Sequence, residues 1–181
     1  MPWTDPSARL AEVRAHRPKK FVFFWKHDRE RDGRVGSGCF SQWFPSRFEI
    51  EGVTYPTAEH WMMAGKARLF GDEAALERIL AAGHPAQAQK LGRQVRGFDQ
   101  ALWEEHRYEL VADGNLAKFT QLPELGEVLR RTAGRVLVEA SPIDRVWGVG
   151  LAADHEAVPD PARWRGLNLL GFALMDVRDR L

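Results

Sequence analysis

Two side chains in the segment 57–70 have types and a spacing suited to acid–base chemistry. Glu59 and Lys66 are seven residues apart, which is two turns of an α-helix, so both leave the same face about 10 Å apart along the axis. Spacing alone is also typical of a solvated helix face. Met62 and Met63 beside the pair indicate instead a half-buried face, where lysine loses its proton more easily and glutamate retains one. Glu59 and Lys66 are therefore the first candidate catalytic residues.

A second candidate site lies in the segment 141–150, which reads SPIDRVWGVG. Asp144, Arg145 and Trp147 place a carboxylate, a cation and a large ring on one short loop bounded by glycines, and loops on a rigid scaffold often carry function. The same residues are equally compatible with an ordinary aspartate turn beside a packed tryptophan. Under the first interpretation, Asp144 and Trp147 are candidate site residues.

Three basic residues, Lys90, Arg93 and Arg96, recur at every third position beside Gly92. Arginine matches the geometry of a phosphate group, so their common helix face is either a phosphate-binding surface or a solvated basic face. No comparable pattern indicates a metal or a cofactor. The six histidines lack ligand spacing, Cys39 is the only cysteine, and no dinucleotide-binding or phosphate-binding glycine loop occurs. We expect neither metal nor cofactor.

Helices and strands must position these residues. Capping residues before apolar runs and glycines after them predict helices at 57–70, 72–82, 85–94, 99–119, 123–133 and 164–181, with the pair at 114–115 as a candidate interruption of the fourth. Strands are expected at 21–25 and 135–139, with a hairpin at 48–55. Residues 1–20 are expected to form a loose arm or a short helix ahead of one domain, 21–181. The predicted fold class is mainly α, a single multihelical domain with two or three short β-strands.

The composition indicates one folded domain with a local site. A chain of 181 residues with 44% hydrophobic and 28% charged residues is neither disordered nor collagen-like. Because 26 Lys and Arg balance 25 Asp and Glu, a broad basic surface for nucleic acid is excluded. No apolar stretch has the length of a membrane span, and a single cysteine suits a reducing compartment. We expect a cytoplasmic protein with no membrane partner.

Six segments together resemble the NADAR (NAD- and ADP-ribose-associated), or YbiA-like, family. The most specific are YPTAEHWMMAGKA at 55–67 and, later in the chain, DRVWGVG at 144–150. The others are GCFSQWF at 38–44, KLGR at 90–93, GNLAKF at 114–119 and WRGLNLLG at 164–171. The likeness extends from about residue 21 to residue 181.

The resemblance implies a mainly helical N-glycosidase, that is, a hydrolase of ribosyl–amine bonds. Its implied substrates are phosphorylated, nucleoside-like ribosylaminopyrimidine intermediates of riboflavin biosynthesis, or ADP-ribosylated guanine, including guanine in nucleic acid. When the roles of the family's motif residues are assigned to the matching positions, Glu59 is a catalytic acid or base, and Lys66 and Asp144 are catalytic partners. The implied substrate-binding residues are Trp147, Trp103, Arg93, Phe40, Ser41 and Asn168.

Substrate and mechanism stay open at this point. The family motif F-S-N-F reads FSQW at 40–43, so substrate identity transfers least. Two mechanisms are compatible with these residues. In the first, Lys66 attacks an opened ribose and forms a Schiff base, while Glu59 transfers protons. In the second, water attacks directly, with Glu59 and Asp144 as the carboxylate pair. The alternative to an enzyme is a non-catalytic ADP-ribose or nucleotide-binding module, against which the joint retention of all three residues argues.

Overall fold

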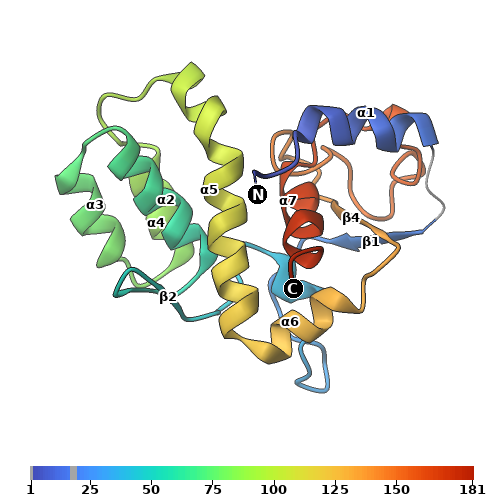
Figure 1. Ribbon diagram of the computed structural model, residues 1–181, viewed down its shortest axis with the longest axis horizontal. Coiled ribbons are helices and arrows are strands. Elements are labelled where there is room, and N and C mark those ends of the chain that lie inside the picture. The colour runs from blue at the N-terminus through green and yellow to red at the C-terminus, as the bar shows by residue number, and fades with distance from the viewer. Residues whose placement is uncertain (1, 17–19) are drawn as a thin grey trace.

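The computed structural model describes residues 2–16 and 20–181. Within these residues the chain forms seven α-helices, four short strands and two 3-10 turns (Figure 1). The helices are α1 (Pro6–His16), α2 (Ala58–Leu69), α3 (Glu73–Leu80), α4 (Pro85–Gly92), α5 (Gln100–Gln121), α6 (Pro123–Arg130) and α7 (Leu169–Arg178). The strands are β1 (Phe21–Phe24), β2 (Phe48–Ile50), β3 (Val53–Tyr55) and β4 (Val136–Glu139), and the 3-10 turns are η1 (Ser37–Phe40) and η2 (Pro161–Arg163). The mainly helical class expected from the sequence is confirmed.

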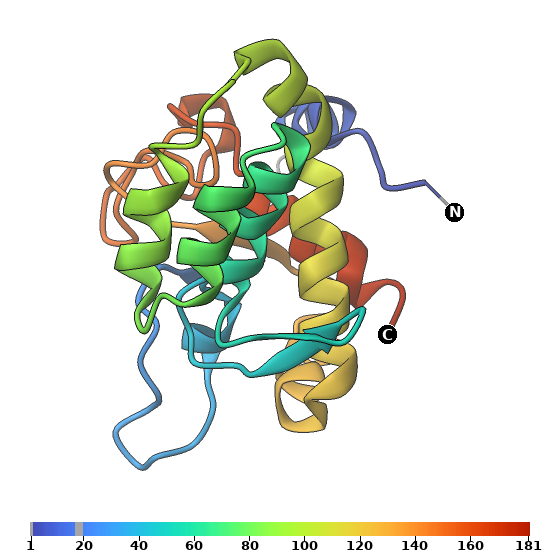
Figure 2. The ribbon, with the colours of Figure 1, turned by 90° about the vertical axis from the view of Figure 1, so that its left-hand side faces the viewer.

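Helix α5 runs through the middle of the molecule (Figure 1). On one side it packs against α2, which in turn contacts α3 and α4, and on the other side it packs against α7. Helix α7 covers β4 of a small parallel sheet. The turned view shows α2, α3 and α4 grouped on one side of α5 and the β1–η1 connection extending away from them (Figure 2). The chain therefore has two halves that meet along α5.

The two-stranded parallel sheet joins distant segments of the chain. Strand β1 pairs with β4 in the register Phe21↔Val136 through Phe24↔Glu139. Both strands are apolar for most of their length because they lie beneath α7 and η1, as expected for parallel strands covered on their faces. Their carboxyl ends emerge at the same edge. Strands β2 and β3 form the predicted hairpin, with Glu51 and Gly52 at φ 52° and 77° in its turn.

Side-chain caps begin several of the predicted helices. Thr57, Asp72 and Asp99 accept hydrogen bonds from the backbone N–H groups of His60, Ala75 and Leu102, at the starts of α2, α3 and α5. Such caps satisfy N–H groups that have no partner within the helix. The predicted starts of these three helices are confirmed.

Two local expectations are wrong. Helix α5 is uninterrupted at Gly114. The glycine is explained by packing instead: a Cβ there would lie 2.1 Å from the ring of Trp61 on α2. The last helix begins at Leu169 rather than residue 164. Asn168 just before it has a left-handed backbone with φ 56°, which an α-helix does not accommodate.

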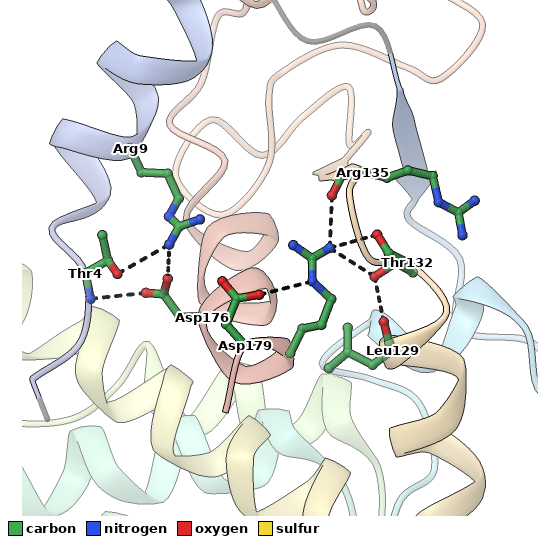
Figure 3. A network of polar contacts seen from close by, with 8 residues as sticks. Thr4, Arg9, Leu129, Thr132, Arg135, Asp176 and Asp179 are labelled. Carbon is green, nitrogen blue, oxygen red and sulfur yellow. Dashed lines mark hydrogen bonds and ion pairs between the residues drawn. The ribbon is translucent and has the colours of Figure 1, made fainter. Parts of the chain in front are cut away.

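Of the two structures expected for residues 1–20, a loose arm or a short helix, the described part forms the helix, α1. Leu10 and Val13 of α1 are buried. Asp176 of α7 accepts hydrogen bonds from Arg9 and from the backbone N–H of Thr4 (Figure 3), and Tyr108 of α5 donates to the same carboxylate. This network ties α1 to the rest of the fold. Among the described residues, no helix has the length and apolarity needed to cross a membrane.

Candidate active site

One cleft of about 1040 Å³ lies between the two halves of the molecule. Its walls come from α2, α4 and the start of α5 on one side. On the other side they come from the segments that follow β1 and β4. The lining includes most of the residues expected at the site, namely Glu59, Lys66, Asp144, Arg93, Trp103, Trp147 and Ser41. The structure thus brings together these side chains from five separate segments.

Glu59 is placed by the first turn of α2. Pro56 ends β3 and Thr57 caps the helix, while the N–H of Glu59 donates to the carbonyl of Gln42 at 2.9 Å. The side chain is 2% exposed, and its Oε1 has no hydrogen-bond partner among the described residues. Burial raises the pKa of Glu59 to about 7 against the opposing effect of hydrogen bonds from Gln89 and Trp43. A carboxyl group with this pKa can both give and take a proton near neutral pH.

Lys66 lies two turns further along the same face of α2. Its Nζ is 4.1 Å from the centroid of the Phe98 ring and 5.5 Å from that of Trp103. Burial lowers the pKa of Lys66, whereas the facing rings stabilise the ammonium form by cation–π attraction. The expected half-buried setting is therefore present. Its aromatic part comes from Phe98, which the sequence did not single out, and from Trp103.

Asp144 is held by the loop that follows β4. Its Oδ1 accepts backbone N–H groups of Val146 and Trp147, both at 2.8 Å, and its own N–H donates to Ser141 Oγ at 3.1 Å. This is an aspartate turn. The two interpretations of the segment coincide, since the turn fixes the carboxylate while Asp144 and Trp147 both line the cleft.

Glu139 is a titratable residue of this cleft that sequence reasoning missed. It ends β4 and lines the cleft beside Asp144. Its Oε2 is enclosed and has no hydrogen-bond partner among the described residues. Burial raises its pKa to about 8, and the charges of Asp144 and Glu59 add to this effect. A carboxylic residue closing an otherwise apolar strand, VLVE at 136–139, was the available sequence signal.

The cleft therefore has two chemically different ends. We call Glu59, Glu139 and Asp144 the carboxyl end, and Lys66, Phe98 and Trp103 the lysine end. Glu59 and Lys66 belong to different ends because two helical turns separate them by about 10 Å. Among the described residues, no group of three or more His, Cys, Asp or Glu side chains is arranged to hold a metal ion.

The basic face expected at 90–96 is only partly a wall of the cleft. Arg93, which follows α4, lines it and donates to Gln89 Oε1 at 3.0 Å. Arg96 instead binds Asp72 through its side chain, with Nη2 2.8 Å from Oδ1, and through its backbone N–H. Lys90 lies outside the lining. Arg93 alone of the three is therefore placed to meet a ligand.

Residues 23–181 match the NADAR domain family. The chain belongs to the NADAR family. It is 39% identical over 165 residues to N-glycosidase R617 of Acanthamoeba polyphaga mimivirus, a match covering 88% of this chain and 95% of that protein. N-glycosidase YbiA of Escherichia coli is 32% identical over 144 residues, which is 80% of this chain and 81% of YbiA.

The NMR structure of Escherichia coli YbiA has the same fold as this NADAR domain. The TM-score is 0.72 at 28% identity, over 90% of this chain and 85% of the YbiA chain. A plant relative, the riboflavin biosynthesis protein PYRR of Zea mays, is 31% identical over 156 residues, which is 80% of this chain and 23% of that longer protein.

Two residues expected to contact substrate lie behind the cleft of this NADAR domain. Phe40 is buried in the core, where its ring packs edge-on against Phe24 with centroids 5.6 Å apart. Asn168 is fully buried, accepts the Glu139 N–H at Oδ1 (3.0 Å) and donates to the Leu137 carbonyl (2.9 Å). Neither lines the cleft. Asn168 instead fixes the end of β4 that carries Glu139.

The C-terminal half of α5 supports the opposite wall. Lys118 is fully buried and donates to the carbonyls of Cys39 and Ser41 at 2.7 and 3.1 Å. Burial lowers its pKa to about 8. Asn115 donates to Oε1 of Gln42 at 2.9 Å. These contacts hold the segment that places Gln42 and Trp43, the two departures from the family motif, in the cleft lining.

Proposed function

We propose that this protein is an N-glycosidase that hydrolyses the bond between a ribosyl C1′ and an amine nitrogen. The observation that carries the proposal is the carboxyl end of the cleft, where Glu59 and Glu139 both have a raised pKa and an unpartnered oxygen. Cleavage of a glycosidic bond needs one group that gives a proton and one that accepts one. Relatives named N-glycosidase over four fifths or more of this chain support the same reaction.

Two routes to the products use residues of this cleft. In the first, Lys66 forms a Schiff base with the opened sugar, which water then hydrolyses, and Glu59 transfers the protons. In the second, water attacks C1′ directly and gives its proton to a carboxylate, with Glu59 and Asp144 as the pair. Both routes end in free amine and free sugar. The lowered pKa of the half-buried Lys66 favours the first route.

The cleft walls suit a phosphorylated substrate with a planar base. Arg93 and Arg107 provide cations on one wall, and Trp43, Trp103 and Trp147 provide rings for stacking. This set fits both implied substrate classes, a phosphorylated ribosylaminopyrimidine and ADP-ribosylated guanine. Because the chain's charge is nearly balanced, ADP-ribosylated nucleic acid would be recognised by its modification. A cytoplasmic location, expected from the single cysteine, is part of the proposal.

A side-by-side turnover assay tests the proposal. Purified protein is incubated with a phosphorylated ribosylaminopyrimidine and with ADP-ribosylated guanosine, and the released base is measured by chromatography. Release from either substrate supports an N-glycosidase and identifies the substrate class. Calorimetry with ADP-ribose is run beside it. Binding without released base in both arms would contradict the enzyme and favour the non-catalytic binding module.

A further inference from the structure

Three residues that line the same cleft each have a buried polar atom with no hydrogen-bond partner among the described residues. The atoms are Gln42 Nε2, Glu59 Oε1 and Glu139 Oε2. Buried polar atoms are almost always paired, and those left unpaired in a native fold are commonly kept for function. One hydrogen-bond donor and two carboxyl oxygens are therefore available to a ligand that carries polar groups.

The backbone of Glu139 is held more firmly than its side chain. Its N–H donates to Asn168 Oδ1 at 3.0 Å, and its carbonyl accepts the Val149 N–H at 3.0 Å. The next residue, Ala140, donates to the carbonyl of Phe24 at 2.8 Å. A Cβ on Gly148 would lie 2.8 Å from the Glu139 carbonyl, so the following loop must pass closely here. The point at which the Glu139 side chain leaves the backbone is therefore fixed.

The position of Glu139 in the sheet also favours contact with a ligand. Strands β1 and β4 are parallel, and the segments leaving their carboxyl ends both form walls of the cleft. Ligands of parallel sheets bind beyond the carboxyl ends of the strands. Glu139 is the last residue of β4, so it stands where a ligand of this sheet would bind.

We propose that Glu139 is a catalytic residue that protonates the leaving amine, with Glu59 as its proton-accepting partner. The inference rests on the proposed N-glycosidase activity. The C1′–N bond breaks with its electron pair moving to nitrogen, and Glu139 gives that nitrogen its carboxyl proton. The new bond at C1′ forms to water, which gives its proton to Glu59, or to the Lys66 amine, which gives its proton to solvent. Exchange with solvent returns the proton to Glu139, and the Lys66 adduct is hydrolysed by water.

The electrostatic surroundings support this division of roles. Burial raises the pKa of Glu139 to about 8, and both Glu59 on α2 and Asp144 on the following loop raise it further. Burial raises the pKa of Glu59 only to about 7, because Gln89, Trp43 and Arg93 oppose it. Different environments for two neighbouring carboxyl groups are what separates an acid from a base. The other charged side chains of the lining are Lys26, Asp28, Lys66, Arg93, Arg107 and Arg145.

The variant Glu139→Gln tests the role because it keeps the shape and a hydrogen-bond donor but holds no transferable proton. We expect kcat to fall by about 100-fold or more, with KM within about threefold of wild type. We expect the activity of the wild type to fall above about pH 8, where Glu139 loses its proton, and this fall should be absent in the variant. The loss should shrink for substrates with a less basic leaving amine. Glu77→Gln, on the exposed face of α3, is the matched control.

The outcomes separate this role from the proposed function. An active wild type with an equally active Glu139→Gln variant overturns the role of Glu139 alone. A wild type that releases no base from either substrate overturns the N-glycosidase activity and this role together. Carbon-13 NMR of the glutamate carboxyl signals in the wild type adds a readout free of folding effects. A Glu139 titration midpoint near pH 8 supports the role, and a midpoint near 4.5 overturns it.

Discussion

The carboxyl end and the lysine end of the cleft are built differently. Asp144 and Glu139 are fixed by backbone hydrogen bonds around β4 and its loop. Phe98, in contrast, is 43% exposed on the connection between α4 and α5, just after Gly97 with φ 71°. Acid–base groups need fixed geometry, whereas recognition of a base tolerates adjustment. The difference indicates that the proton transfers take place at the carboxyl end.

The largest expected effect comes from breaking the carboxyl end at Glu59. Glu59→Gln removes the group whose pKa of about 7 suits proton transfer in both directions, so we expect turnover to fall by about 100-fold or more. The fold should persist, since glutamine has the same size. Glu105→Gln, exposed on α5, is the control. Normal turnover in a folded Glu59→Gln protein would remove this residue from the mechanism.

The next prediction tests whether Lys66, at the lysine end, forms a bond to C1′. If Lys66 attacks C1′, borohydride added during turnover should trap a sugar on the protein, and mass spectrometry should place it at Lys66. Lys66→Arg keeps the charge facing the rings but has no nucleophilic amine, so trapping and most of the activity should be lost. An active protein that cannot be trapped, together with an active Lys66→Arg variant, would leave direct attack by water at the carboxyl end.

Each end of the cleft contains residues that the sequence could predict and residues that it could not. Glu59 and Lys66 follow from a spacing of seven within one capped helix, and the aspartate turn from a local motif. Glu139 and Asn168 do not, because their positions depend on β1 pairing with β4 across most of the chain. Arg96 was misleading for the same reason, since Asp72, which binds it, is the capping residue of α3, far from Arg96 in the sequence. Local patterns predicted the helices, whereas tertiary pairing decided which polar residues face the cleft.

The smallest effect concerns the energetic cost of the carboxyl end. The folded-state pKa of Glu59, about 7, lies above its ordinary value of 4.5, so the folded protein binds more protons than the unfolded chain between these two values. The contribution of Glu59 to the free energy of unfolding should therefore be most favourable below about pH 4.5 and should fall as the pH rises through 7. Glu139 extends the same trend to about pH 8. The Asp72–Arg96 pair adds no pH dependence to the free energy of unfolding between pH 4.5 and 8, because the lowered pKa of Asp72 keeps this carboxylate ionised throughout.

Glu59→Gln carries no such penalty, so this variant should be as stable as wild type near pH 4 and more stable at pH 8, by on the order of 3 kcal/mol. Urea unfolding of both proteins at the two pH values measures the difference, with Glu105→Gln as the control. Gains of this kind are typical when a residue is kept for activity at the expense of stability. A variant that is less stable than wild type at pH 8 would mean that the ionised Glu59 is well satisfied. The carboxyl end would then lack the strained, proton-holding character that sets it apart from the lysine end.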